Sequence, residues 1–152
     1  MNNRMYSYSM SDLFPIIEEL INMDRQVVIT ARGNSMRPIL RDRADRLILS
    51  KPCDKVEIGD VLLYEKPDGV FVLHRVVSVE EDGTYTFMGD CQNNKDVGIT
   101  PDMIRAKLVG FFRSGKEISV ESHRYKNFVS FWIKSRFVRR IYVGIFHRLK
   151  TR

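Results

Sequence analysis

The chain has 152 residues, of which 43% are hydrophobic and 29% charged, and its formal net charge is +6. That length suits one domain that buries its own core, and the composition is ordinary for a globular protein. Cys53 and Cys91 fit no metal-ligand or redox spacing, and no zinc pattern, glycine-rich phosphate loop or nicotinamide fingerprint occurs. We therefore expect neither a metal nor a cofactor.

The first segment, residues 1–26, is predicted to be helical. Ser11 is the expected N-cap, with Asp12 favourably placed in the first turn and Pro15 tolerated close to the start. The apolar residues that recur at helical spacing are Leu13, Phe14, Ile16, Ile17, Leu20 and Ile21. This pattern favours a helix that packs on the domain that follows.

Residues 27–120 are predicted to form a mainly β domain, a small coiled or barrel-like antiparallel fold. Turn signals such as Pro67-Asp68-Gly69 and Glu81-Asp82-Gly83 recur every eight to twelve residues between strand-type runs. Arg43 and Asp45, in one of these runs, are expected to form a solvated charge pair. The predicted strands are residues 27–31, 43–49, 58–64, 70–77, 85–87, 104–112 and 116–118.

A turn at residues 33–38, Gly-Asn-Ser-Met-Arg-Pro, follows the first predicted strand. Gly and Pro make a sharp bend there, and Ser35 at its apex can expose its hydroxyl beside unpaired backbone N–H groups. An acyl-transfer nucleophile needs both features. Taken alone, the hexapeptide is better explained as ordinary turn chemistry.

Two further features follow along the chain. His74 lies 39 residues after Ser35 within the apolar run of residues 70–77, where a hydrogen-bonded core histidine is the simplest interpretation. Residues 87–96 then form a strand that runs into a polar turn containing Asp90 and Asp96. A neutral imidazole can take a proton from a serine, and a carboxylate can fix the tautomer of the ring.

In this order, the three motifs resemble those of the signal peptidase and LexA-like serine peptidases, most closely the signal peptidases that use histidine. The resemblance covers roughly residues 27–118 and implies the LexA/signal peptidase type of β-fold. It also implies that Ser35 is the nucleophile, His74 the general base and Asp96 the orienting carboxylate. Met36 and Pro38 would support the nucleophile turn.

The sequence departs from that family at two places. Many bacterial signal peptidases carry a hydroxyl where this chain has Gly33, so the second oxyanion donor is either a backbone N–H or the Asn34 amide. Cys91 and Gln92 also intervene before the asparagines of the polar turn, which makes Asp90 the alternative to Asp96. We favour Asp96, because Gly89 and Asp90 are typical of a structural turn.

The resulting expectation is a serine endopeptidase that cleaves a peptide or protein precursor through a covalent acyl-enzyme. A catalytically silent peptide-binding module is the first alternative. A self-cleaving LexA-like regulator is the second, although no DNA-binding domain precedes the peptidase-like region and no cleavage segment of the Ala-Gly type is evident.

The tail, residues 121–152, differs in kind. From Ser122 onward it carries nine Lys or Arg and no Asp or Glu, so it contributes +9 and the remainder −3 (+6 − 9). Its aromatic and helically spaced apolar residues predict a basic amphipathic helix. Residues 124–152 are expected either to contact an anionic membrane or to cover the β-domain, and no nucleic acid partner is expected because no helix-turn-helix is visible.

The expected location is cytoplasmic, with peripheral membrane contact as the alternative. The apolar runs are far shorter than the roughly 20 residues that span a bilayer. The first thirty residues also lack the basic start and apolar stretch of a secretory signal. Together with the unpatterned cysteines, these features favour a reducing compartment.

Overall fold

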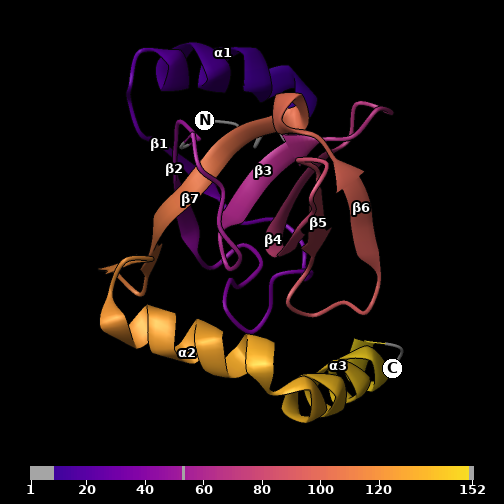
Figure 1. Ribbon diagram of the computed structural model, residues 1–152. Coiled ribbons are helices and arrows are strands. Elements are labelled where there is room, and N and C mark those ends of the chain that lie inside the picture. The colour runs from indigo at the N-terminus through magenta and orange to yellow at the C-terminus, as the bar shows by residue number, and fades with distance from the viewer. Residues whose placement is uncertain (1–8, 53, 151–152) are drawn as a thin grey trace.

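The computed structural model describes residues 9–52 and 54–150 and shows a mixed α/β fold (Figure 1). An N-terminal helix, α1, precedes an antiparallel sheet of eight strands, and two helices, α2 and α3, follow it. The fold was predicted to be mainly β, but the tail adds two full helices to the first one. Cys53 and the ends of the terminal segments, residues 1–8 and 151–152, lie outside the described residues.

Helix α1 spans Met10–Asn22, and its N-cap is Ser9, so the prediction of Ser11 was wrong. The Asp12 N–H donates to Ser9 Oγ at 3.1 Å, and the Ser9 N–H donates to the Asp12 carboxylate at 3.1 Å. This reciprocal pair is a capping box, which satisfies two of the N–H groups that a helix start leaves free. The helix then buries one face through Phe14, Ile17 and Ile21.

The sheet is open, not coiled or closed as predicted. Its strand order is β1-β2-β7-β3-β4-β5-β6 with β8 paired to β7, and no ladder joins β1 to β6 among the described strands. A short 3₁₀ turn, Pro101–Met103, leads into β7. The strands are β1 Val27–Thr30, β2 Arg46–Ser50, β3 Val61–Glu65, β4 Phe71–Val79, β5 Tyr85–Met88, β6 Lys95–Ile99, β7 Ile104–Arg113 and β8 Lys116–Ser119.

Both faces of the sheet carry apolar clusters. The larger cluster joins the sheet to α1 through Phe14, Ile17 and Ile21, and to α2 through Val129 and Trp132. The smaller cluster lies on the other side of β3 and β4, because alternate residues of a strand point to opposite faces. It comprises Leu62, Tyr64, Val76, Phe87 and Ile99.

The tail forms two helices, α2 His123–Lys134 and α3 Arg136–Lys150, where one amphipathic helix was predicted. Figure 1 shows both at the end of the sheet opposite α1. Val129, Trp132 and Val143 are buried. None of the helices in the described residues is long and apolar enough to cross a membrane.

Asp45 is fully buried, which overturns the predicted solvated pair with Arg43. Its carboxylate pairs with Arg41 at 2.9 Å and with Arg113 at 2.5 Å. Arg43 is instead exposed, 4.0 Å from Asp42. Because Arg113 is contributed by β7, 68 residues further along the chain, sequence proximity gave no sign of the pairing.

Candidate active site

His74 lies on β4, opposite Leu62 of β3, and is only 6% exposed. Its Nδ1 atom lies 3.1 Å from Asp96 Oδ2 and 3.2 Å from the Tyr64 hydroxyl. Asp96 lies on β6 and pairs with Phe87 of β5 in the ladder. The adjacent strands β4, β5 and β6 therefore bring together an imidazole and a carboxylate that are 22 residues apart in the sequence.

The Asp96 carboxylate also receives two donors that the sequence did not predict. Lys66 Nζ lies 2.6 Å from Oδ1, and the Tyr64 hydroxyl donates to Oδ2 at 2.5 Å. Burial opposes the charge on Asp96, but the hydrogen bonds from Lys66, Tyr64 and His74 outweigh it and lower the pKa of the carboxyl. Asp96 is therefore an anion at neutral pH.

Tyr64 and Lys66 are positioned by the β3–β4 hairpin. The Lys66 N–H donates to the carbonyl of Val70 at 2.9 Å, which closes the hairpin and sets the register. Since Leu62 is opposite His74, the alternate residues 64 and 66 lie on the His74 face. The hairpin signal of Pro67-Asp68-Gly69 could have indicated that residues 64 and 66 share the face of His74, but nothing in the sequence indicated their contact with Asp96.

Burial lowers the pKa of His74, because the charged imidazolium loses its hydration. The Asp96 carboxylate opposes this shift in part, and the Lys66 ammonium adds to it. The pKa of Tyr64 is raised by burial and by Asp96, so its hydroxyl stays protonated. With Tyr64 donating to Asp96, the network is satisfied when His74 carries its proton on Nδ1, which leaves Nε2 as an acceptor.

Ser35 lies in the turn at residues 33–38, which we call the nucleophile turn. The Gly33 N–H donates to the Asp42 carboxylate at 2.9 Å, and Asn34 Oδ1 accepts a hydrogen bond from Arg37 Nε at 2.7 Å. Met36 is buried at 5% exposure and anchors the turn in the core, whereas Ser35 is half-buried.

The nucleophile turn lies against the residues that follow β5. The Cys91 N–H donates to the Ser35 carbonyl at 2.7 Å, and a Cβ atom added at Gly89 would lie 2.7 Å from the same oxygen. Met88 is opposite Arg75 in the antiparallel β4–β5 ladder, so the chain at Gly89 runs on in the direction of His74. Only glycine permits this close approach of the two backbones.

No hydrogen bond joins the Ser35 hydroxyl to His74 among the described residues. Ser35 and Leu73, the residue before His74, line one cavity of about 140 Å³. In unliganded sites, the hydrogen bond between nucleophile and base is often long and tightens only with substrate. Because Leu73 and His74 are consecutive residues of β4 and point to opposite faces of the sheet, this cavity does not bring the Ser35 hydroxyl next to the imidazole.

The oxyanion donors predicted near Ser35 differ in their availability. The Gly33 N–H is taken by Asp42. In the part of the chain that the structure describes, the N–H groups of Ser35 and Met36 donate no hydrogen bond. These two backbone groups, together with the Asn34 side-chain amide, are the candidates that remain for stabilising a developing negative charge.

Asp90, the alternative third residue, is occupied elsewhere. Its carboxylate takes two hydrogen bonds from Arg75, at 2.8 Å from Nε and 2.7 Å from Nη2. Both side chains are buried, and Arg75 also donates to the carbonyl of Gly59 at 2.7 Å. Asp90 therefore holds the polar turn to β4, while Asp96 is the carboxylate that touches His74.

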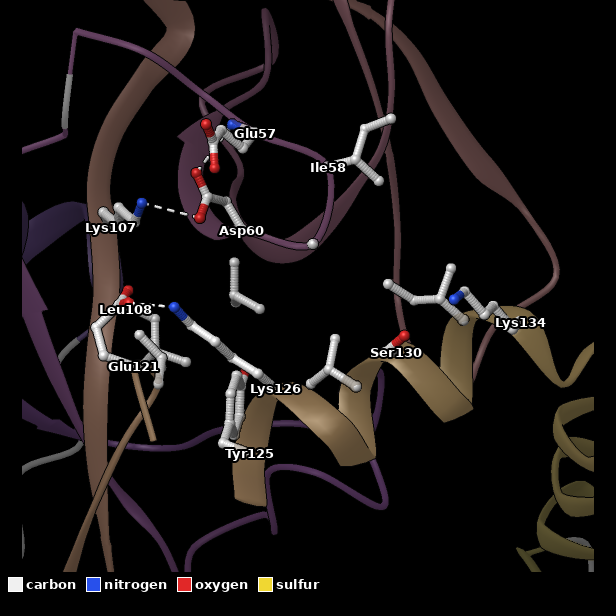
Figure 2. Close-up of a pocket in the computed structure, with 15 residues that line it drawn as sticks. Glu57, Ile58, Asp60, Lys107, Leu108, Glu121, Tyr125, Lys126, Ser130 and Lys134 are labelled. Atoms are coloured by element: carbon white, nitrogen blue, oxygen red, sulfur yellow. Dashed lines mark hydrogen bonds and ion pairs between the residues drawn. The ribbon is translucent and has the colours of Figure 1, made fainter. Parts of the chain in front are cut away.

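A larger cavity of about 500 Å³ lies between α2 and the turn that precedes β3 (Figure 2). Lys107 pairs with Asp60 at 2.8 Å and Lys126 with Glu121 at 2.5 Å along its wall. None of the predicted site residues lines it. Because these charges neutralise each other in pairs, the candidate active site remains the one that contains Ser35, His74 and Asp96.

The predicted site residues thus fall into three places. His74 and Asp96 are in direct contact, Ser35 lies in the turn packed against Gly89 and Cys91, and Asp90 is in a separate ion pair. No metal-binding group of three or more His, Cys, Asp or Glu occurs in the described residues. No protein-family model and no curated protein sequence matches the chain.

Proposed function

We propose that the protein is a serine endopeptidase of the signal peptidase and LexA-like type. The observation that carries the proposal is the contact of 3.1 Å between His74 Nδ1 and Asp96. It holds a neutral imidazole whose Nε2 atom is available as a proton acceptor. The nucleophile turn packs against Gly89 and Cys91, which follow β5, the strand paired with the one that carries this imidazole.

In the proposed reaction, Ser35 Oγ bonds to the carbonyl carbon of the scissile peptide while its proton moves to His74 Nε2. The Asp96 carboxylate stabilises the imidazolium that results, and backbone N–H groups of the nucleophile turn receive the oxyanion. His74 then gives the proton to the departing amine, leaving an ester on Ser35. A water molecule, deprotonated by His74, hydrolyses the ester and restores the serine.

The surface next to Ser35 suits an extended peptide. A second cavity, of about 540 Å³, shares Arg32, Phe71 and Leu73 with the cavity at Ser35 and continues along β1. In the sheet, β1 pairs only with β2 among the described strands, so its other edge has free backbone groups. A peptide can add to such an edge through main-chain hydrogen bonds. We propose a peptide or protein precursor as the substrate and a cytoplasmic setting for its cleavage.

A peptide-binding module without catalysis is the second candidate. The absence of a hydrogen bond between Ser35 and His74 favours it, because the same groove can hold a peptide with no reaction. Cleavage and binding must therefore be measured separately.

The test is incubation of the purified chain with a mixed peptide library, followed by mass spectrometry of the products. The peptidase proposal predicts that wild type cleaves peptides and that Ser35→Ala does not. The control variant Ser130→Ala, which changes an exposed serine on α2, should cleave like wild type. Peptide binding that persists in Ser35→Ala while wild type cleaves nothing would support the binding module. Shortening of the chain itself, at a rate independent of its concentration, would support self-processing.

A further inference from the structure

Helix α3 exposes a continuous apolar stripe to solvent. Val138, Ile141, Ile145 and Leu149 follow one another at steps of three or four residues, which places them on one face. Their exposed fractions are 41%, 46%, 55% and 70%, and the neighbouring Phe137 is 76% exposed. We call these five residues the tail stripe.

Another face of α3 already packs against the protein. Val143 is buried, and Tyr142 contacts the ring of Trp132 with centroids 5.4 Å apart. Arg139 Nη2 donates to the carbonyl of Gln92 at 3.2 Å. The covering role expected for the tail is filled by this face, so the tail stripe is a second apolar surface that the sheet leaves uncovered.

Helix α2 extends the same kind of surface. Phe128 is 43% exposed and Phe131 is 54% exposed, while Trp132 between them and α3 is buried. Exposed cationic side chains accompany the apolar ones on both helices: Arg124, Lys126, Lys134, Arg140 and Arg148. Lys126 pairs with Glu121 at 2.5 Å, but no Asp or Glu occurs from Ser122 to the end of the chain, so the two helices carry a net positive charge.

We propose that the tail stripe docks the protein on the surface of an anionic lipid bilayer. Apolar side chains flanked by Lys and Arg match both parts of such a surface, since the former enter the acyl boundary and the latter meet the anionic headgroups. A second copy fits less well, because two stripes would bring two cationic tails together. Nucleic acid would be bound through its phosphates and would leave the apolar residues unused.

Docking through this surface also orients the candidate active site. The guanidinium of Arg37, in the nucleophile turn, lies 5.4 Å from the ring centroid of Phe146 on α3. Through this contact and the bond from Arg139 to Gln92, α3 touches both loops that surround Ser35. A docked α3 therefore keeps the nucleophile turn close to the lipid surface. The docking itself does not depend on the peptidase proposal.

The test is co-sedimentation of the full chain with vesicles of equal parts phosphatidylglycerol and phosphatidylcholine, compared with pure phosphatidylcholine. We expect binding to the anionic vesicles that weakens with added salt. The double variant Ile141→Asp/Ile145→Asp is expected to bind about tenfold more weakly or worse. Ile16→Asp/Val79→Asp makes the same charge change at exposed apolar residues outside the tail and should bind more tightly than the stripe variant.

The fold of each variant is checked through Trp132, the single tryptophan of the chain, which is 4% exposed. If the fluorescence emission of Trp132 changes in the double aspartate variant, the milder variant Ile141→Ser/Ile145→Ser is used in its place. The proposal is overturned if the stripe variant and the control variant lose vesicle binding equally, or if wild type does not bind anionic vesicles. If wild type self-associates and the stripe variants do not, the partner is a second copy of the chain and the proposal is overturned. If the chain binds an oligonucleotide but not vesicles, the partner is a nucleic acid and the proposal is overturned.

Discussion

His74 Nδ1 lies 3.1 Å from Asp96 Oδ2, so the carboxylate holds the ring with Nε2 as its free acceptor. Tyr64 and Lys66 hold that carboxylate in turn, through hydrogen bonds of 2.5 and 2.6 Å. If the peptidase proposal holds, cleavage is expected to depend on each link of this chain, and most on the links nearest to the proton that moves.

Asp96→Asn should lower kcat/KM by about ten-thousandfold, because the amide cannot stabilise the imidazolium and favours the wrong tautomer. The matched variant Asp90→Asn removes a buried charge from the ion pair with Arg75 and is expected to destabilise the fold by roughly 3–5 kcal/mol. Peptide cleavage and thermal unfolding of both variants separate the two roles. A folded Asp96→Asn variant with wild-type activity would contradict the role of Asp96.

The pH dependence of kcat/KM should report His74. Only the neutral imidazole accepts a proton, so activity is expected to fall as pH falls through the pKa of His74. Because burial lowers that pKa below the ordinary value of 6.5, the midpoint should lie on the acidic side of 6.5. A midpoint above 6.5, or a profile unaffected by pH between 4 and 8, about the range in which histidine titrates, would argue against His74 as the base.

Lys66→Gln should move that midpoint to higher pH. The Lys66 ammonium disfavours a second positive charge on His74, so its removal raises the pKa of the imidazole. Lys95→Gln, at an exposed lysine that begins the same strand as Asp96, serves as the control and should leave the midpoint in place. Equal shifts in both variants would mean that only the overall charge of the protein matters.

Gly89→Ala should impair the site through packing alone. The added methyl group would lie 2.7 Å from the Ser35 carbonyl and 2.8 Å from Gln92 Oε1, which forces the nucleophile turn away from β5. We expect a loss of about 1–3 kcal/mol in the free energy of unfolding and a matching fall in cleavage. Gly144→Ala, with no atom within 4 Å, should keep activity and stabilise α3 by up to roughly 1 kcal/mol.

Much of the fold could be predicted, because local chemistry fixes it. The Pro67-Asp68-Gly69 turn and the alternation of β3 and β4 set a hairpin whose register also fixes the neighbours of His74. The strand β6 was missed, since residues 95–99 include a glycine and two charged residues and resemble a loop. The open sheet could not be foreseen either, because turn spacing does not say which distant strands pair.

The site was predictable in part for the same reason. The contact of His74 with Asp96 agrees with the order of the motifs, whereas the pairing of Asp90 with Arg75 depends on the β4–β5 register. Tyr64 and Lys66 went unnoticed because a tyrosine and a lysine in a strand usually signal only packing and solvation. Their role appears once β6 places Asp96 beside them.

A double-mutant cycle of Ser35→Ala and His74→Ala on kcat/KM for one cleaved peptide tests the central claim most directly. Groups that act as a unit are non-additive, so each single variant and the double variant are expected to fall to the same residual rate. Cleavage that survives either single substitution, or losses that multiply in the double variant, would contradict a shared proton between the two residues.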